Sequence, residues 1–133
     1  MEDIIENNRT ALVKLYLEKG RETLHDADIF IASGSLNAAV NRIFYSVLQS
    51  VSALFVRDGY RIKKHLDMSK TLYTQYVLTG KIDKDFSLFF TQLEKMKNNA
   101  DYVPTFQVAK EEIMEFRPKA DAFIATIKNL IGI

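Results

Sequence analysis

Cysteine is absent from this chain of 133 residues, and histidine occurs only twice. The absence of cysteine excludes a disulfide framework and any metal site built on thiolates. The two histidines, His25 and His65, lie on separate segments with no acidic partner at ligand spacing, so the sequence predicts no metal site and no cofactor. No complete catalytic motif is present either, and we therefore expect a function in binding or assembly before one in catalysis.

A surplus of charge is also missing, since 18 basic side chains are matched by 17 acidic ones. Such a balance creates no overall field that would attract nucleic acid. The residues near Met1 are acidic and polar, unlike a signal peptide, and no apolar run approaches the roughly 20 residues that cross a bilayer. The sequence therefore predicts a cytoplasmic protein without a membrane partner.

Apolar residues, by contrast, make up 47% of the chain and include nine Phe and six Tyr, which is enough for one sizeable core. They recur at three, four or seven residues, as on one face of a helix, and nowhere alternate as in a strand. The sequence predicts one all-α domain over residues 1–133, an up-and-down bundle of four to five helices. The predicted helices span Arg9–Ser33, Leu36–Asp58, roughly Leu66–Thr79, Asp83–Ala100 and roughly Val108–Ile131.

Only five glycines and two prolines interrupt these segments. Gly34 follows the first periodic segment and can close that helix in the left-handed conformation. Pro104 favours an extended Val103, which should end the fourth helix near Ala100. Pro118 lies inside the last predicted helix, where its ring and missing N–H should kink the helix or split it in two. We expect a kink.

A local basic cluster interrupts the even charge pattern between the second and third predicted helices. A phosphate-bearing ligand would fit such a cluster, and so would a solvated loop that its charges keep soluble. The composition leaves both interpretations open. The basic residues are Arg57, Arg61, Lys63 and Lys64, with His65 and Lys70 nearby, against the acidic residues Asp58 and Asp67.

A second stripe runs beside the apolar face of the second predicted helix. Its side chains are small or form hydrogen bonds, where a solvated face would carry more Glu and Lys. It is either the contact face of a two-fold homodimer or a strip that packs inside the bundle. This polar stripe consists of Ala38, Arg42, Tyr45, Gln49 and Ser52.

Several short motifs occur in a fixed order along nearly the whole chain. Together they resemble the signature of the HEPN domain family, whose small helical domains are often paired with minimal nucleotidyltransferases. The motifs are Ala39–Ser46 (AVNRIFYS) followed by Ala53–Phe55 and Gly59, the loop histidine His65, the turn Val77–Ile82 (VLTGKI) and Ala100–Tyr102 (ADY).

The resemblance implies a four- to five-helix bundle that is frequently a homodimer. It also implies a link to nucleotide binding, to RNA cleavage, or to toxin–antitoxin pairs with a nucleotidyltransferase. The ribonuclease members carry an Arg followed a few residues later by a His, so that a cation and an acid/base meet at a phosphodiester. This sequence lacks that motif and has Lys97 where the related group has Arg. Lys97 can hold a charge there, but it cannot reproduce the bidentate fork of Arg.

The resemblance further implies one polar groove in which a nucleotide or a partner side chain docks. Its residues would be Arg42, Tyr45, His65, Lys97, Asp101 and Tyr102. Two of them have an alternative, purely structural role, in which Asp101 accepts backbone N–H bonds at the helix end and Tyr102 buries its ring.

Three functions follow from these residues. We expect a HEPN-type binding module that dimerises, works beside a nucleotidyltransferase and takes a nucleotide or RNA as its ligand, and we assign no catalytic residue. The enzymatic alternative is an RNase whose catalytic pair is rebuilt from Arg42, His65 and Lys97. The third alternative is a purely structural helical adaptor.

Overall fold

A computed structural model describes residues 2–63 and 67–133, with side chains described from residue 7 onward. The described residues form helices and no strand, which confirms the predicted all-α bundle. The elements are α1 (Glu2–Ser33), α2 (Leu36–Arg57), α3 (Met68–Leu72), the π-helical turn η1 (Tyr73–Val77), α4 (Lys84–Tyr102) and α5 (Lys110–Ile131).

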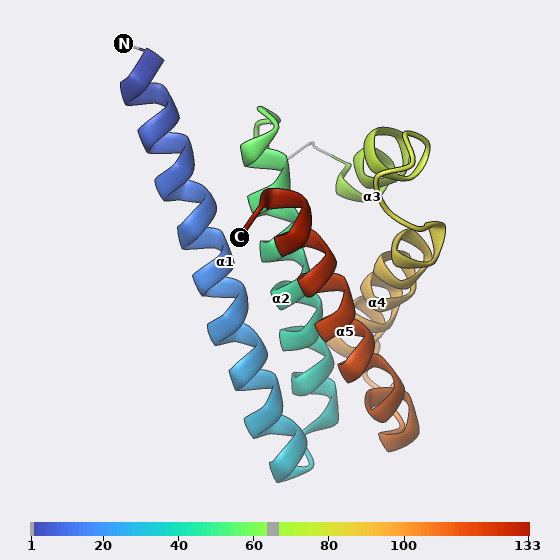
Figure 1. Cartoon of the computed structure of the whole chain (residues 1–133). Helices are drawn as coiled ribbons and strands as arrows, with labels where there is room; N and C mark the ends of the chain where they lie inside the picture. The colour runs from blue at the N-terminus through green and yellow to red at the C-terminus, as the bar shows by residue number, and fades with distance from the viewer. Residues whose placement is uncertain (1, 64–66) are drawn as a thin grey trace.

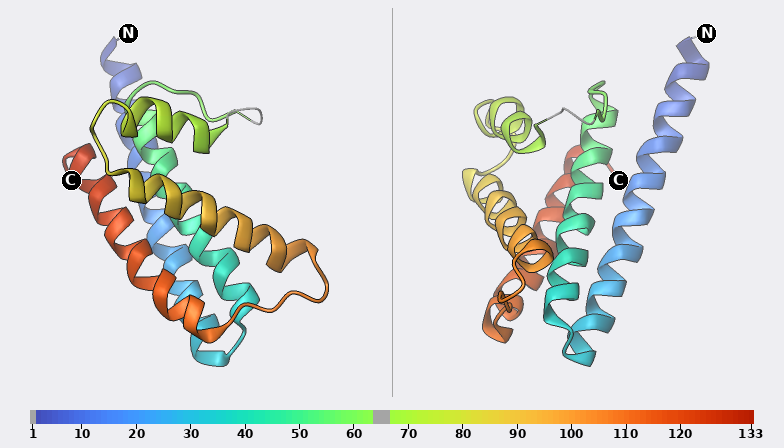
Figure 2. Two further views of the ribbon diagram at one scale, coloured as in Figure 1. Left: turned by 90° about the vertical axis from the view of Figure 1, so that its right-hand side faces the viewer. Right: turned by 180° about the vertical axis from the view of Figure 1, so that it is seen from behind.

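Helix α2 occupies the centre of the bundle, and α1, α4 and α5 each pack against it (Figure 1). Its residues Val47, Val51 and Leu54 are completely buried, as the apolar stripe of this helix requires. By length and composition α2 could cross a membrane, but most of it is buried inside the bundle, as in the core helix of a soluble protein. Helix α1 lies alongside α2 in all three views, and its N-terminal turns extend beyond the other helices (Figures 1 and 2).

The contact between α1 and α2 is close because the facing side chains are small. A Cβ atom added to Gly20 would lie 3.1 Å from the backbone oxygen of Ser46 and 3.2 Å from Oγ of Ser50. The hydroxyl of Ser46 donates a hydrogen bond of 2.8 Å to the carbonyl of Gly20. Gly20 therefore allows the two backbones to approach, and Ser46 joins them.

Aromatic rings fill the other side of α2, where α4 and α5 pack. Phe44 of α2 lies against Phe90 of α4, with ring centroids 5.8 Å apart. Phe89 of α4 meets Phe116 of α5 edge to face at 5.5 Å. Offset and edge-to-face pairs of this kind add about 0.5–1.5 kcal/mol each beyond the area that they bury.

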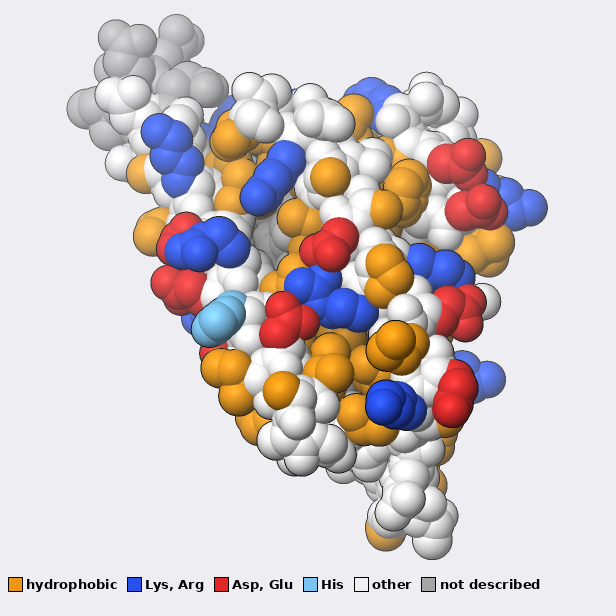
Figure 3. Space-filling model, turned by 60° about the horizontal axis from the view of Figure 1, so that its bottom comes forward, with side chains coloured by type: hydrophobic (Ala, Val, Ile, Leu, Met, Phe, Trp, Pro, Cys, Tyr) orange, Lys and Arg blue, Asp and Glu red, His pale blue; other side chains and the backbone are white. Residues whose placement is uncertain are grey.

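Polar contacts join helices that are far apart in the sequence. The guanidinium of Arg117 in α5 donates to both carboxylate oxygens of Asp28 in α1, at 2.7 and 3.0 Å, and also lies 2.7 Å from Asp121. These hydrogen bonds hold the pKa of Asp28 below its usual range. Charges elsewhere are interspersed: Figure 3 shows basic and acidic side chains side by side, with apolar ones between them and no large area of one sign.

Several of the predicted boundaries differ from the structure. Helix α1 begins at Glu2 rather than Arg9, because acidic residues favour the N-terminus of a helix. The prediction began later because apolar residues do not recur at helical spacing before Arg9. Helix α4 continues to Tyr102 rather than ending near Ala100, so Pro104 acts only on the residue directly before it. The third predicted helix consists of α3 followed by the π-helical turn η1, and its predicted start at Leu66 lies outside the described residues.

Helix α5 runs continuously through Pro118, which excludes a split. Pro118 is exposed, so its ring lies on the outer side of the helix, and it has no N–H to donate to the preceding turn.

The close contact at Gly20 generates a stability prediction. Replacing Gly20 with Val should lower the free energy of unfolding by about 1–3 kcal/mol, because the new atoms would clash with the backbone of Ser46. Ala11→Val, at an exposed position of the same helix, is the matched control and should change stability by about 0.5 kcal/mol or less. Urea denaturation of both variants measures the difference. Equal stability of the two variants would show that α1 and α2 tolerate a wider separation.

Candidate functional site

The structure brings five of the six predicted groove residues to one place. Arg42 and Tyr45 lie in the N-terminal half of α2, and Lys97, Asp101 and Tyr102 lie in the last turns of α4, which crosses α2 at this level. Positions four residues apart share a helix face, so Lys97 and Asp101 both point toward α2. We call this group, together with Asn41 and Phe44, the α2–α4 cluster. The sixth predicted residue, His65, lies outside the described residues.

Lys97 is the buried cation of the cluster, with only 6% of its surface exposed. Its ammonium lies 3.1 Å from a carboxylate oxygen of Asp101. It is also within 5.1–5.7 Å of the ring centroids of Phe44, Tyr45 and Tyr102, a distance at which a cation is attracted to an aromatic face. Burial opposes the charge, but hydrogen bonds with Asp101 and Tyr45 outweigh it and raise the pKa of Lys97. Lys97 is therefore a fixed positive charge at neutral pH.

Asp101 connects the two helices. Both of its carboxylate oxygens accept hydrogen bonds from the amide nitrogen of Asn41, at 3.1 and 3.0 Å. The alternative role at a helix end is wrong for Asp101, because α4 continues past it and its carboxylate faces Asn41 and Lys97 instead of backbone N–H groups. It is also wrong for Tyr102, which is 74% exposed instead of buried. Tyr102 covers Lys97 from outside, where a ligand can reach its hydroxyl.

Asn41, like Phe44, is a residue of this cluster that the sequence analysis did not single out as a site residue. It donates to Asp101 with its amide nitrogen and accepts two hydrogen bonds from Arg42 with its amide oxygen, at 2.9 and 2.6 Å. The guanidinium carbon of Arg42 lies 5.3 Å from the centroid of the Tyr45 ring. Asn41 thus links the carboxylate of Asp101 to the guanidinium of Arg42. The only sequence signal for this role was its place inside the Ala39–Ser46 motif.

A surface hollow of about 410 Å³ lies beside the cluster. Asn41, Arg42 and Asp101 contribute its polar wall, and Phe30 of α1 contributes an apolar one. The hollow is open to solvent, so a ligand here can contact the guanidinium of Arg42 directly.

The polar stripe of α2 is partly buried. Ala38, Arg42, Tyr45 and Gln49 are half-buried, and Ser52 is buried with its hydroxyl bonded to the carbonyl of Leu48. Tyr45 contacts Lys97 of α4, while Gln49 lies next to Gly20 of α1, so the stripe runs between these two helices. In the rear view of Figure 2, no other helix of the described chain lies over this side of α2. Ser52 is internal packing, and the other four positions remain available for contact.

The residues of the predicted basic cluster have different roles in the structure. Arg57 pairs with Asp58 at 2.8 Å and donates to the carbonyl of Leu130, so it serves to hold α5 against the end of α2. Arg61 and Lys63 are exposed, and Lys64 lies outside the described residues. These groups follow the C-terminal end of α2, about 18 Å along the helix from Tyr45.

Asp58 joins the C-terminal end of α2 to η1. The hydroxyl of Tyr76 donates to its carboxylate at 2.6 Å. Burial raises the pKa of Asp58, but the hydrogen bonds from Arg57 and Tyr76 more than compensate and lower it overall.

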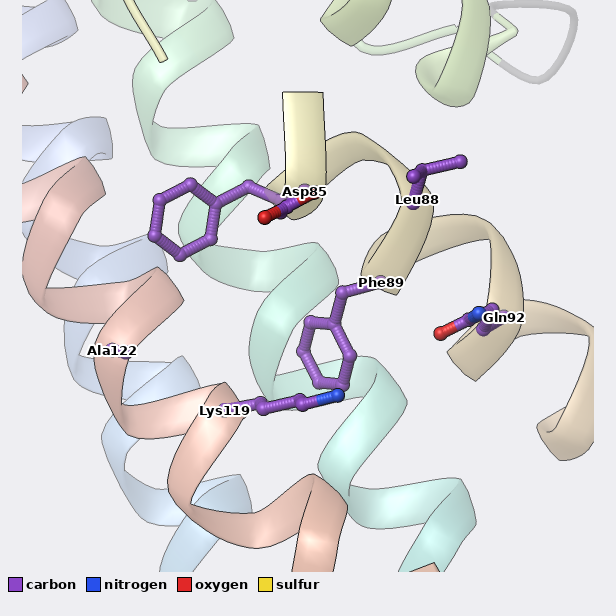
Figure 4. Close-up of a pocket in the computed structure, with 7 residues that line it drawn as sticks. Asp85, Leu88, Phe89, Gln92, Lys119 and Ala122 are labelled. Atoms are coloured by element: carbon purple, nitrogen blue, oxygen red, sulfur yellow. The ribbon is translucent and has the colours of Figure 1, made fainter. Parts of the chain in front are cut away.

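Another hollow lies between α4 and α5, and Figure 4 shows its walls. Its volume is about 300 Å³, and Leu88, Phe89 and Lys119 line it. Lys119 already pairs with Glu115 at 3.0 Å. Among the described residues, no group of three or more His, Asp or Glu side chains is arranged to hold a metal ion. The α2–α4 cluster is therefore the best candidate for a functional site.

Comparison with known proteins agrees with the motifs. The model of the HEPN domain family matches residues 13–130. A UPF0332 protein of Thermotoga maritima is 28% identical over 125 residues, which cover 94% of this chain and 95% of that protein.

Two proteins of Methanocaldococcus jannaschii are also similar. "Putative toxin MJ0142" is 25% identical over 115 residues, covering 86% of this chain and 78% of its own. "Putative toxin MJ0605" is 25% identical over 119 residues, which cover 90% of this chain and 88% of that protein.

The buried ion pair generates a double-mutant prediction. Asp101→Ala should lower the free energy of unfolding by about 1–3 kcal/mol, because it leaves the ammonium of Lys97 buried without its carboxylate. Adding Lys97→Met should restore most of that loss, since an apolar side chain of similar length fits among the three rings. Urea denaturation of the two single variants and the double variant gives the coupling energy. Strictly additive effects would contradict a direct interaction.

Proposed function

The chain belongs to the HEPN domain family, and on that premise we propose that it is the binding and assembly component of a toxin–antitoxin pair. In this proposal the domain forms a two-fold homodimer and engages a nucleotidyltransferase, as a member of the subgroup with an A-D-Y motif. The similarity to two proteins that are named putative toxins supports the toxin–antitoxin setting.

The α2–α4 cluster is the observation that carries the proposal. It holds Lys97 in a permanently charged state and places Arg42 and Tyr102 at the surface around it. The guanidinium of Arg42 and the hydroxyl of Tyr102, beside the Lys97–Asp101 pair, are suited to a phosphate group or to a carboxylate of a partner protein. The site therefore favours recognition of an anion, either on a nucleotide or on the nucleotidyltransferase.

The same geometry argues against acid/base catalysis by the cluster. A general base must be able to accept a proton near neutral pH, whereas the raised pKa of Lys97 keeps its ammonium protonated. His25 is exposed on α1, one turn before Asp28, which pairs with Arg117 of α5. His65 lies outside the described residues.

Homodimerisation is proposed through the polar stripe. Four of its residues are half-buried in one protomer, on the side of α2 that lies between α1 and α4. A two-fold axis through this side would bring each residue of the patch against the same patch of the other copy. The half-buried Tyr45 and Arg42 have the composition that is enriched in the centres of protein interfaces.

The assembly proposal predicts a loss of association in one variant. Tyr45→Glu should convert the dimer to a monomer, because one substitution introduces two negative charges into a two-fold interface. Tyr73→Glu, at a 43% exposed tyrosine of η1, is the matched control and should stay dimeric. Light scattering measures the mass of each protein, and circular dichroism confirms that both are folded.

The Tyr45→Glu and Tyr73→Glu variants also test whether the chain binds a nucleotidyltransferase. A tagged nucleotidyltransferase encoded next to the gene should retain the wild type and the Tyr73→Glu control, and should retain Tyr45→Glu poorly. A monomeric wild type at high concentration, or a folded Tyr45→Glu variant that stays dimeric, would contradict the assembly proposal.

A binding role also predicts that the purified protein does not cleave single-stranded RNA above background. Neither Mg²⁺ nor Mn²⁺ should restore cleavage, because the described residues hold no group of three or more His, Asp or Glu side chains that could bind a metal ion, and Lys97 is not available as a base. Gel analysis of a labelled RNA measures the result. Cleavage that disappears in His65→Ala would instead support the RNase alternative built from Arg42, His65 and Lys97.

A further inference from the structure

A groove runs between α4 and α5, away from the α2–α4 cluster. It consists of two hollows, the one of about 300 Å³ that Figure 4 shows and a second of about 390 Å³. Gln92 lines both, and Lys119 of the first hollow pairs with Glu115 of the second at 3.0 Å, so the two hollows adjoin. We call them together the α4–α5 groove. By helical spacing, its α4 residues lie on the opposite side of that helix from Lys97 and Asp101.

The floor of the groove is apolar. Phe89 of the first hollow and Phe116 of the second are in edge-to-face contact at 5.5 Å, which makes the floor continuous. Phe86 and Met96 are only half-buried along it, and Leu88 beside them is 49% exposed. A continuous apolar strip between charged rims is typical of a surface that another protein covers.

The length of the groove fits one helix. Its lining residues on α4 run from Asp85 to Asn99, which is about 21 Å along the helix axis. A helix of about four turns has the same length, and an amphipathic helix can lay its apolar face on such a strip. Both hollows are open to solvent, so a small molecule would stay largely exposed in either of them. The shape therefore favours a helix over a small molecule.

The two rims of the groove carry charges of opposite sign, and the pattern reverses along its length. In the second hollow, Lys95 lies on the α4 rim, and Glu112 and Glu115 lie on the α5 rim. In the first hollow, Asp85 lies on the α4 rim and Lys119 on the α5 rim. The Lys119–Glu115 pair is exposed, so an incoming charge can replace either partner at little cost.

From this juxtaposition we propose that the α4–α5 groove docks an amphipathic helix of a partner protein. The apolar face of that helix lies on the floor, and each of its flanks is basic in one half and acidic in the other, opposite to the rims. The groove shares no residue with the α2–α4 cluster or with the polar stripe. The proposal therefore does not depend on the functions proposed for those two surfaces.

Fluorescence anisotropy of two labelled peptides with the full chain tests the groove. The matched peptide has about four helical turns, a leucine face at the i, i+3, i+4 and i+7 spacing, and flanking Lys and Glu in the order that the rims require. The exchanged peptide has each flanking Lys replaced by Glu and each Glu by Lys, so its length, apolar face and net charge are unchanged. Turning a helix end for end leaves the required pattern the same, so reversal cannot rescue the exchanged peptide. The matched peptide should bind about fivefold more tightly or better.

Leu88→Asp tests the apolar floor. It should weaken binding of the matched peptide about tenfold, because it places a charge where the leucine face docks, and it should stay folded because Leu88 is 49% exposed. Leu15→Asp, at a 65% exposed leucine of α1 that lines neither hollow, is the matched control and should bind as the wild type does.

A charge exchange tests the rims. Lys95→Glu combined with Glu115→Lys reverses the charges of the second hollow and leaves the net charge unchanged. This variant should lose most of the preference for the matched peptide. Lys14→Glu combined with Glu22→Lys, at exposed positions of α1, is the matched control and should keep that preference.

The proposal is overturned if neither peptide binds, if both bind equally, or if Leu15→Asp loses as much affinity as Leu88→Asp. Light scattering of the two leucine variants gives the remaining distinction. A dimer that is lost in Leu88→Asp and kept in Leu15→Asp would show that a second copy of the chain occupies the groove, which would also overturn the proposal.

Discussion

Burial of α2 on nearly all sides is the constraint on which the rest of this structure depends. Val40, Val47, Val51 and Leu54 are completely inaccessible, and no single neighbouring helix is wide enough to cover them all. Each neighbour therefore covers one side: α1 at the close contact of Gly20, and α4 and α5 through their aromatic rings. The side between α1 and α4 is left with the polar stripe, which explains why the candidate site lies there.

Charged groups at the two ends of α2 have different roles. At the C-terminal end, Arg57, Asp58 and Tyr76 satisfy one another and hold α2, η1 and α5 together. Near the N-terminal end, the chain buries Lys97 among aromatic rings. A buried ion pair is commonly no more stabilising than apolar residues of the same volume. Stability alone therefore gives little reason to keep a lysine there, which is consistent with the proposal that the cluster around it recognises an anion.

Lys97 cannot do at this position what an arginine would do. An arginine fork would bind two oxygens of one phosphate, whereas an ammonium acts as a compact point charge. Here the carboxylate of Asp101 already occupies one side of that charge, and Asn41 ties the carboxylate to α2. The cluster is thus a pre-organised network rather than an isolated cation, and Arg42 and Tyr102 are the parts of it that remain accessible to a ligand.

The sequence by itself determined the helical segments and the central place of α2. Apolar spacing is a local property, and a helix with apolar residues on several sides, such as Val47 and Phe55, can only lie inside a bundle. The resemblance to the HEPN family, which short sequence motifs carry, grouped Arg42, Tyr45, Lys97, Asp101 and Tyr102 with His65. Local spacing could not show how these residues are connected, or whether a ligand can reach them.

Only the tertiary structure decided those points, because they depend on how α4 crosses α2. Asn41 meets Asp101 across a separation of 60 residues. Whether Tyr102 is buried or exposed depends on where α4 leaves the bundle, and the pKa of Lys97 depends on rings and a carboxylate from both helices. The surface hollow lined by Tyr16 and Tyr60 likewise exists only because α1 packs beside the segment that follows α2. Contacts of this kind follow from the relative placement of helices, which helical periodicity does not encode.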